Sequence, residues 1–103
     1  MSSMYIEEYE SLAQINNGGL IQAGRQLPLA VQKITFTGTA GSSAAFNAKT
    51  KYVRIHPDAI CSYRFGTAGT GQDATVGYPR MIAGQTEYFA TAPGQFLSTI
   101  ANT

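Results

Sequence analysis

Cysteine, histidine and tryptophan are almost absent from this sequence. Its 103 residues include one cysteine, Cys61, one histidine, His56, and no tryptophan. A single cysteine excludes an internal disulfide, and a chain without a disulfide framework is typical of a protein made in a reducing cytosol. One histidine and one cysteine also fall short of the four ligands that zinc prefers in a structural site. We therefore predict neither a bound metal nor a cofactor.

Charge is scarce as well. Charged residues make up 13% of the chain and the formal net charge is +1, whereas an ordinary globular protein carries roughly 25% charged residues. A nearly neutral chain lacks the basic stripe that nucleic-acid binding requires, so we predict no nucleic-acid partner. A weakly charged exterior also has little to keep molecules apart in solution, which favours a protein that functions within an assembly.

Long apolar runs are missing too. No run approaches the roughly 18–20 residues needed to span a bilayer. The start of the chain, MSSMYIEEYESLAQI, has no basic stretch followed by an apolar core, which is the pattern of a secretory signal peptide. We therefore predict a soluble protein with no membrane partner that is synthesised in the cytoplasm.

Residues 1–28 differ in pattern from the rest of the chain and are predicted to form an N-terminal arm with a short helix. Their apolar side chains recur at helical spacing at Ile6, Tyr9 and Leu12. A serine could cap the helix, nearby glutamates favour its positive end, and the run NNGG ends it. Such an arm either packs along its own domain or lies across a neighbouring subunit, and the sequence leaves both alternatives open.

From residue 29 onward the pattern is that of β-structure. Short runs of β-branched, aromatic and alternating residues are separated by turn signals every 8–12 residues, which is typical of a sandwich. We predict a single all-β domain over residues 29–103, a small jelly-roll or immunoglobulin-like β-sandwich with six to eight short antiparallel strands. The predicted strands are residues 29–37, 44–47, 52–56, 60–66, 78–82, 85–91 and 96–100.

Residues 50–66, TKYVRIHPDAICSYRFG, are predicted to form two central strands and a tight bend. Apolar and polar side chains alternate in both runs, with a proline and an aspartate between them. The alternation places one set of side chains in the core and turns the arginines and the histidine outward. The predicted core residues are Val53, Ile55, Cys61, Tyr63 and Phe65.

His56, Asp58 and Cys61 lie close together in the sequence, which is the nearest approach to a catalytic constellation. A catalytic histidine needs a nucleophile or a second acid or base within hydrogen-bond reach. However, Cys61 alternates with aromatic residues on the apolar face, where a small buried thiol is the favoured interpretation. The run GTAGTG also lacks the Lys-Ser/Thr pair of a phosphate-binding loop. We predict no catalytic residue and no enzyme.

Protein binding is the remaining possibility that individual residues support. Arginine and tyrosine are enriched at protein interfaces, and three arginines could line up with tyrosines across neighbouring strands. The alternative is that these side chains are scattered over a solvent-facing surface. The apolar residues of the arm are the second candidates. The predicted interface residues are Ile6, Tyr9, Leu12, Arg54, Arg64 and Arg80.

The strings TKYVRIHPDAICSYRFG (residues 50–66), PRMIAGQTEYF (79–89) and PGQ (93–95) resemble a group of small tailed-bacteriophage virion proteins. The resemblance covers residues 22–103 and concerns overall pattern, with no catalytic motif. Small β-sandwich proteins of phage heads commonly act as decoration, or cement, proteins that bridge capsid subunits. The resemblance therefore implies a structural protein on the phage head surface. Its partners would be the major capsid protein, other virion proteins and its own copies, in a dimer or trimer.

Two alternatives stay open beside the decoration protein. The first is another part of the virion, such as a head–tail connector, a tail component or a fibre-attachment subunit. The second belongs to a different class, a carbohydrate-binding β-sandwich module or a small hydrolase on the same architecture. A carbohydrate-binding module would need exposed aromatic platforms, and the sequence offers six tyrosines for them.

Overall fold

The computed structural model of the chain describes residues 2–10, 12–14, 20–24, 28–67 and 73–102. These residues form ten β-strands and contain no helix. The strands are β1 (Ser2–Tyr9), β2 (Leu12–Gln14), β3 (Leu20–Gly24), β4 (Ala30–Phe36), β5 (Gly41–Ser42), β6 (Tyr52–Pro57), β7 (Cys61–Thr67), β8 (Arg80–Met81), β9 (Glu87–Ala90) and β10 (Gln95–Ala101).

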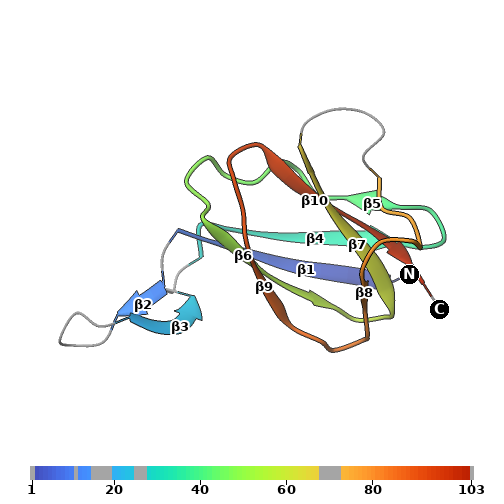
Figure 1. The fold of residues 1–103 in the computed structure, drawn as a ribbon, viewed down its shortest axis with the longest axis horizontal. Helices are drawn as coiled ribbons and strands as arrows, with labels where there is room; N and C mark the ends of the chain where they lie inside the picture. The colour runs from blue at the N-terminus through green and yellow to red at the C-terminus, as the bar shows by residue number, and fades with distance from the viewer. Residues whose placement is uncertain (1, 11, 15–19, 25–27, 68–72, 103) are drawn as a thin grey trace.

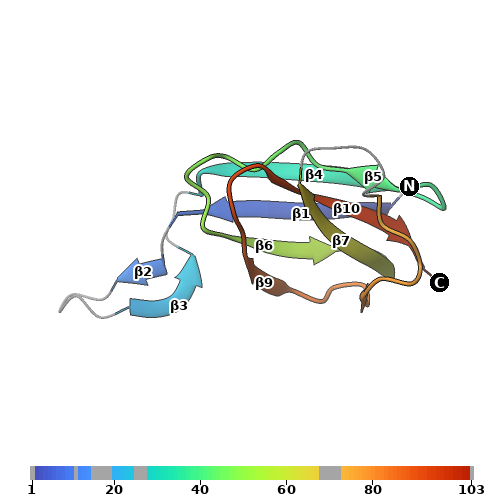
Figure 2. The same cartoon turned by 45° about the horizontal axis from the view of Figure 1, so that its top comes forward.

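Eight of the strands form two four-stranded antiparallel sheets that face each other (Figure 1). One sheet, called here the β1 sheet, has the order β4-β1-β6-β9, and the other, the β10 sheet, has the order β5-β10-β7-β8. The predicted all-β, sandwich-like architecture is thus confirmed. Strands β2 and β3 pair with each other, and Figures 1 and 2 both place this hairpin beyond one end of the two sheets.

The predicted N-terminal helix is wrong, because residues 2–9 form β1. This strand lies inside the β1 sheet, between β4 and β6. Met4, Ile6 and Glu8 alternate along it as buried side chains, each at most 1% exposed. An isolated helix of one to three turns is marginal in water, whereas β1 gains a ladder on each side and a buried face. The first strand of the sandwich therefore comes from the segment that the sequence pattern assigns to the arm.

Most other strands lie where the alternating pattern predicts them, with one exception. Residues 44–47 form no strand; instead, β5 lies within the preceding segment, residues 38–43. Phe46 is nevertheless held at the sandwich, because its backbone N–H donates to the Gln95 carbonyl at 2.8 Å and its ring is buried. The apolar residue in this run thus docks into the core from an irregular segment.

The bend after β6 carries the chain from one sheet to the other. Strand β6 belongs to the β1 sheet and β7 to the β10 sheet, so the two central strands do not pair as a hairpin. Asp58 fixes the crossing point to the start of β1. Its carboxylate accepts the Ser3 N–H at 2.7 Å, and its own N–H donates to the Ser3 carbonyl at 2.9 Å.

The core lies between the sheets and draws on both of them. The predicted core residues Val53, Ile55 and Cys61 are fully buried. Tyr63 and Phe65 are partly buried against the same cluster. The buried apolar cluster consists of Met4, Ile6, Ile34, Phe36, Phe46, Val53, Ile55, Cys61, Met81 and Leu97.

Glu8 is a buried charged side chain that joins three segments. One carboxylate oxygen accepts the Thr50 hydroxyl at 2.8 Å and the Asn47 N–H at 2.7 Å. The other accepts the Gln32 amide at 2.9 Å. Gln32 in turn accepts the Ala44 N–H at 2.9 Å, so that its amide orientation is fixed. Because a buried polar group must be hydrogen-bonded to be tolerated, this network replaces the solvent that the carboxylate loses.

Thr99 is a polar residue within the core. Its side chain is fully buried opposite Tyr63, and its hydroxyl has no hydrogen-bond partner among the described residues. We expect Thr99→Val to raise the free energy of unfolding by about 1 kcal/mol, because it removes a desolvated hydroxyl while keeping the branched shape. Urea denaturation measures the difference. Thr50→Val is the matched control and should destabilise the chain, because the Thr50 hydroxyl donates to Glu8. A loss of stability at both positions would contradict the prediction.

Candidate interaction face on the β1 sheet

The outer face of the β10 sheet is covered by the chain itself. The Ala74 N–H donates to the Ser98 hydroxyl at 2.9 Å, and the Asn102 amide donates to the Ser62 hydroxyl at 2.7 Å. Both serines point outward from the sheet, yet both are fully buried. Residues 68–72 lie outside the described part of the chain, but Ala74, shortly after them, is packed on the sheet at 2% exposure.

The outer face of the β1 sheet is open by comparison. It carries the side chains that alternate with the core residues of β4, β1, β6 and β9. Val31 is 66% exposed, Tyr88 50% and Tyr5 41%. Tyr5 lies directly opposite Lys33, whose ammonium group is 5.7 Å from the centroid of its ring. We call this surface the tyrosine face; it consists of Tyr5, Glu7, Tyr9, Val31, Lys33, Tyr52, Arg54, His56 and Tyr88.

Three rings cross the tyrosine face from β1 to β9. Tyr9 stacks on Tyr52 with ring centroids 5.3 Å apart, and Tyr52 meets Tyr88 at 6.3 Å. Cross-strand aromatic pairs of this kind contribute roughly 0.2–1 kcal/mol each. The exposure rises along the row, from 3% at Tyr9 to 50% at Tyr88. The row is therefore anchored in the sheet at β1 and presents its last ring at the sheet edge.

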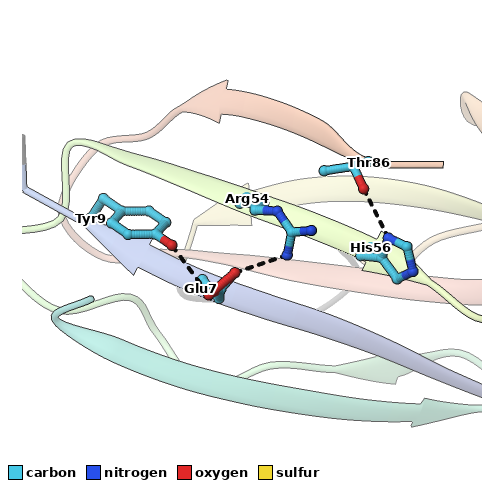
Figure 3. Close-up of polar contacts among 5 residues, drawn as sticks. All are labelled: Glu7, Tyr9, Arg54, His56 and Thr86. Carbon is cyan, nitrogen blue, oxygen red and sulfur yellow. Dashed lines mark hydrogen bonds and ion pairs between the residues drawn. The ribbon is translucent and has the colours of Figure 1, made fainter. Parts of the chain in front are cut away.

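Arg54 is oriented by an ion pair beside this row. Its guanidinium donates to the Glu7 carboxylate at 2.8 Å, and the Tyr9 hydroxyl donates to the other Glu7 oxygen at 3.1 Å (Figure 3). The Arg54 and Glu7 side chains keep 32% and 27% of their surface exposed, so the pair adds little to stability. Its effect is positional, because the guanidinium is presented in a fixed direction while part of it stays accessible.

His56 and Cys61 are not a nucleophile–base pair. His56 lies on the tyrosine face, where its Nδ1 is 2.8 Å from the Thr86 hydroxyl (Figure 3). Cys61 lies on the other side of the β1 sheet, in the core, with no exposed surface. The Asp58 carboxylate accepts a hydrogen bond from the Ser3 backbone N–H. The three residues that are close in sequence therefore lie in three different environments and form no common site.

The thiol of Cys61 is expected to be unreactive in the folded chain. Burial raises its pKa to about 11, against a smaller opposing effect of a hydrogen bond with the Met81 backbone. Because only the thiolate is nucleophilic, roughly one molecule in a thousand is reactive at pH 8. We expect modification by a disulfide reagent at pH 8 to be at least about 100-fold slower for the native chain than in denaturant. Equal rates in the two conditions would show that Cys61 is accessible.

The predicted interface residues fall into separate places. Arg54 lies on the tyrosine face, whereas Arg64 and Arg80 belong to the β10 sheet. The Arg64 guanidinium lies over the Tyr78 ring at 4.9 Å, and Arg80 donates to the Asn102 carbonyl at 3.3 Å. The expected single line of arginines and tyrosines is thus divided between the two outer faces of the sandwich.

The arm residues among these candidates are also dispersed. Ile6 is fully buried in the core, and Tyr9 is 3% exposed at the base of the tyrosine face. Leu12 is the first residue of β2, and its side chain lies outside the described part of the structure. Sequence reasoning missed Tyr5 and Glu7, which alternate with Met4 and Ile6. Treating residues 2–9 as a strand would have placed both on the outer face.

Three further observations bear on the kind of site. Within the described residues, no group of three or more histidine, cysteine or acidic side chains could hold a metal ion. No helix in that part of the chain is long and apolar enough to cross a membrane. No family model, curated protein or solved structure matches the chain significantly.

Proposed function

We propose that this protein is a structural component of a tailed-bacteriophage virion, a decoration subunit that stabilises the head by binding the major capsid protein. The observation that carries the proposal is the contrast between the two outer faces. The β10 sheet is covered by the chain's own residues, whereas the β1 sheet presents exposed tyrosines, a valine and an oriented arginine. The resemblance of residues 22–103 to small virion proteins supports the same role.

The chemistry of the tyrosine face suits binding to a protein. Tyrosine and arginine are among the residue types enriched at interface hot spots. Tyrosine buries a large area while fixing only two side-chain torsions, and the planar guanidinium of arginine presents several donors at once. The charges of its central pair, Arg54 and Glu7, balance each other. A subunit that binds only the assembled shell stabilises it by mass action, so that many weakly bound copies suffice.

The remaining parts of the proposal concern location and assembly. The protein would occupy the outer surface of the head after synthesis in the host cytoplasm, as a dimer or trimer of this chain. The finer fold class, jelly-roll or immunoglobulin-like, stays a prediction. The absence of catalytic activity, of a cofactor and of a nucleic-acid partner also stay predictions.

Co-sedimentation with expanded empty heads of the encoding phage tests the proposal. We expect the purified chain to sediment with the heads at micromolar concentration. The double variant Tyr5→Ser, Val31→Ser should bind at least about tenfold more weakly, because it truncates exposed apolar side chains of the face. Val76→Ser is the matched control. Val76 is 61% exposed, but it lies in residues 73–79, which pack against the β10 sheet and not on the tyrosine face.

The outcomes of this experiment are distinct. Failure of the unmodified chain to sediment with heads would contradict the proposal. Binding to purified tails or necks alone would favour the connector or tail alternative. Equal binding by the face variant and the control would retain the head partner but assign it to another surface. Thermal unfolding of each variant shows whether it is folded.

A further inference from the structure

One edge of the sandwich is open for pairing with another strand. Strands β5 and β8 end the β10 sheet with two residues each, which blunts that sheet at both sides. Strand β4 is accompanied by residues 41–44, because Gly41 packs against Thr35 and Ala44 bonds to Gln32. Strand β9 ends the β1 sheet, and no described strand pairs with it on its far side.

The backbone groups that β9 offers at this edge can be assigned. In an antiparallel ladder, alternate residues bond to one neighbour and the residues between them point to the other side. The Thr91 N–H donates to the Lys51 carbonyl at 2.9 Å. Phe89 and Glu87, which are in step with Thr91, therefore bond to β6. The N–H and C=O groups of Tyr88 and Ala90 point away from the sheet.

Natural edge strands are protected by lysine, proline or a bulge. The sequence of β9, EYFA, contains none of these. Its one charged side chain, Glu87, lies on the inner face opposite Ile55, where a charge can also protect an edge, but its carboxylate is held by the Gln85 amide at 2.7 Å. No charge on Tyr88 or Ala90 opposes the approach of another backbone. The edge is therefore equipped to accept a strand.

We propose that the occupant of this edge is a second copy of the chain, with the two β9 strands antiparallel about a two-fold axis at Phe89. In this register Tyr88 is opposite Ala90 of the second copy, and the reverse pair repeats the same contact. Each such pair exchanges both of its backbone hydrogen bonds between the groups that the edges leave open. A symmetric dimer requires a single self-complementary surface, and this edge meets that requirement.

Side-chain size and charge agree with this register. On the outer face each Tyr88 ring meets the small side chain of Ala90 in the second copy. On the inner face the two Phe89 rings meet at the axis, where each is already 5.2 Å from Phe65 and 5.4 Å from Tyr63. Glu87 falls opposite Thr91 of the second copy, so that no like charges are paired. The two aromatic clusters become continuous across the axis.

The dimer joins two β1 sheets into one continuous sheet and places two tyrosine faces side by side. An edge as short as β9 buries less than the roughly 1,200 Å² of a standard interface. We therefore expect a weak dimer, populated at about 10–100 μM. This inference does not rest on the proposed function, because the dimer forms without capsids and involves residues other than Tyr5 and Val31.

Two measurements on the purified chain test the inference. Sedimentation equilibrium from about 1 to 500 μM should show a monomer–dimer transition, and Ala90→Pro should weaken it at least about tenfold. Proline removes the N–H that faces the edge and is tolerated in an edge strand at such a position. Ala90→Thr, which keeps the N–H, is the matched control. A monomer throughout this range, or an unaffected dimer in a folded Ala90→Pro variant, would overturn the proposal.

Amide hydrogen exchange gives a second readout that needs no variant. The amides of Tyr88 and Ala90 should exchange about three- to sevenfold more slowly at roughly 500 μM than at roughly 5 μM, which is the fall in the monomer fraction for a dimer of this strength. Those of Glu87 and Phe89, which bond to β6, should be protected at both concentrations. Concentration-independent exchange at Tyr88 and Ala90 would overturn the proposal even if the chain dimerises by another surface.

Discussion

Replacing Glu8 with glutamine is expected to lower the free energy of unfolding by about 2–3 kcal/mol, because the exchange leaves buried polar groups without partners. The carboxylate accepts three hydrogen bonds, from Thr50, Asn47 and Gln32, and donates none. If the new amide keeps its oxygen toward Thr50 and Asn47, its NH₂ group faces the NH₂ group of Gln32. Two donors then oppose each other at a side chain that is 1% exposed.

Rotation of Gln32 does not relieve this conflict. Its side-chain oxygen accepts the Ala44 N–H at 2.9 Å, and turning the amide would break that bond. The double variant Glu8→Gln, Gln32→Glu should therefore recover part of the stability, but it loses the bond that the Gln32 amide donates to the Ala44 carbonyl at 3.3 Å. In it the carboxylate at position 32 accepts from both the position-8 amide and Ala44. A double-mutant cycle measures this coupling directly.

Urea denaturation with a shared slope provides the free energies, and thermal unfolding should show a decrease of roughly 8–20 °C for Glu8→Gln. Glu10→Gln is the matched control, since Glu10 is exposed and its exchange should change stability by no more than about 0.5 kcal/mol. A double variant less stable than Glu8→Gln alone would contradict the prediction. It would show that donor–acceptor matching between positions 8 and 32 does not account for the loss of stability.

Glu8 also explains why sequence reasoning predicts a helix where β1 lies. Met4 and Ile6 begin a period-2 pattern, but a glutamate at the next core position interrupts it. Burial of a carboxylate is favourable only with its partners in place, and Asn47 and Thr50 lie 39 and 42 residues away. The helical spacing of Ile6, Tyr9 and Leu12 is then the stronger local signal. The strand forms because Glu8 finds hydrogen-bond partners in distant segments, and the local sequence gives no sign of those contacts.

The opposite holds for the segment around β6 and β7. There alternation alone predicts the buried set and the outward direction of Arg54 and His56. What alternation cannot predict is that the two strands enter different sheets. That depends on Asp58 bonding to Ser3, which is 55 residues away. The tyrosine face is consequently predictable residue by residue in β6 but not as one surface.

Gly41→Ala is the second variant with a large expected effect. Gly41 lies in β5, and a Cβ atom built there would overlap the backbone carbonyl of Thr35 and lie 2.8 Å from the Ile34 side chain. A backbone carbonyl in a strand cannot turn aside as a flexible side chain can, so β5 must move away from β4. We expect a loss of about 3 kcal/mol in the free energy of unfolding, at the upper end of the usual cost of overpacking.

Gly38→Ala is the matched control for this variant. Beyond its chain neighbours, no atom of the described residues lies within 4 Å of a Cβ at Gly38, so the substitution should change stability by less than about 1 kcal/mol. Urea denaturation of the two variants separates close approach at Gly41 from the general effect of replacing glycine in this segment. Equal stabilities for the two variants would show that β5 can move from β4 without cost.

The consequence of Gly41→Ala extends to association of the chain. Strand β5 pairs with β10 through Ser42 and Gly41, and Gly41 also packs closely against Thr35 and Ile34 of β4. Its displacement would expose β4, a seven-residue edge strand, which is a template for pairing with other chains. We therefore expect Gly41→Ala to form higher oligomers with rising concentration, unlike the limited dimer expected through β9. Light scattering distinguishes the two, because Ala90→Pro should not suppress association through β4.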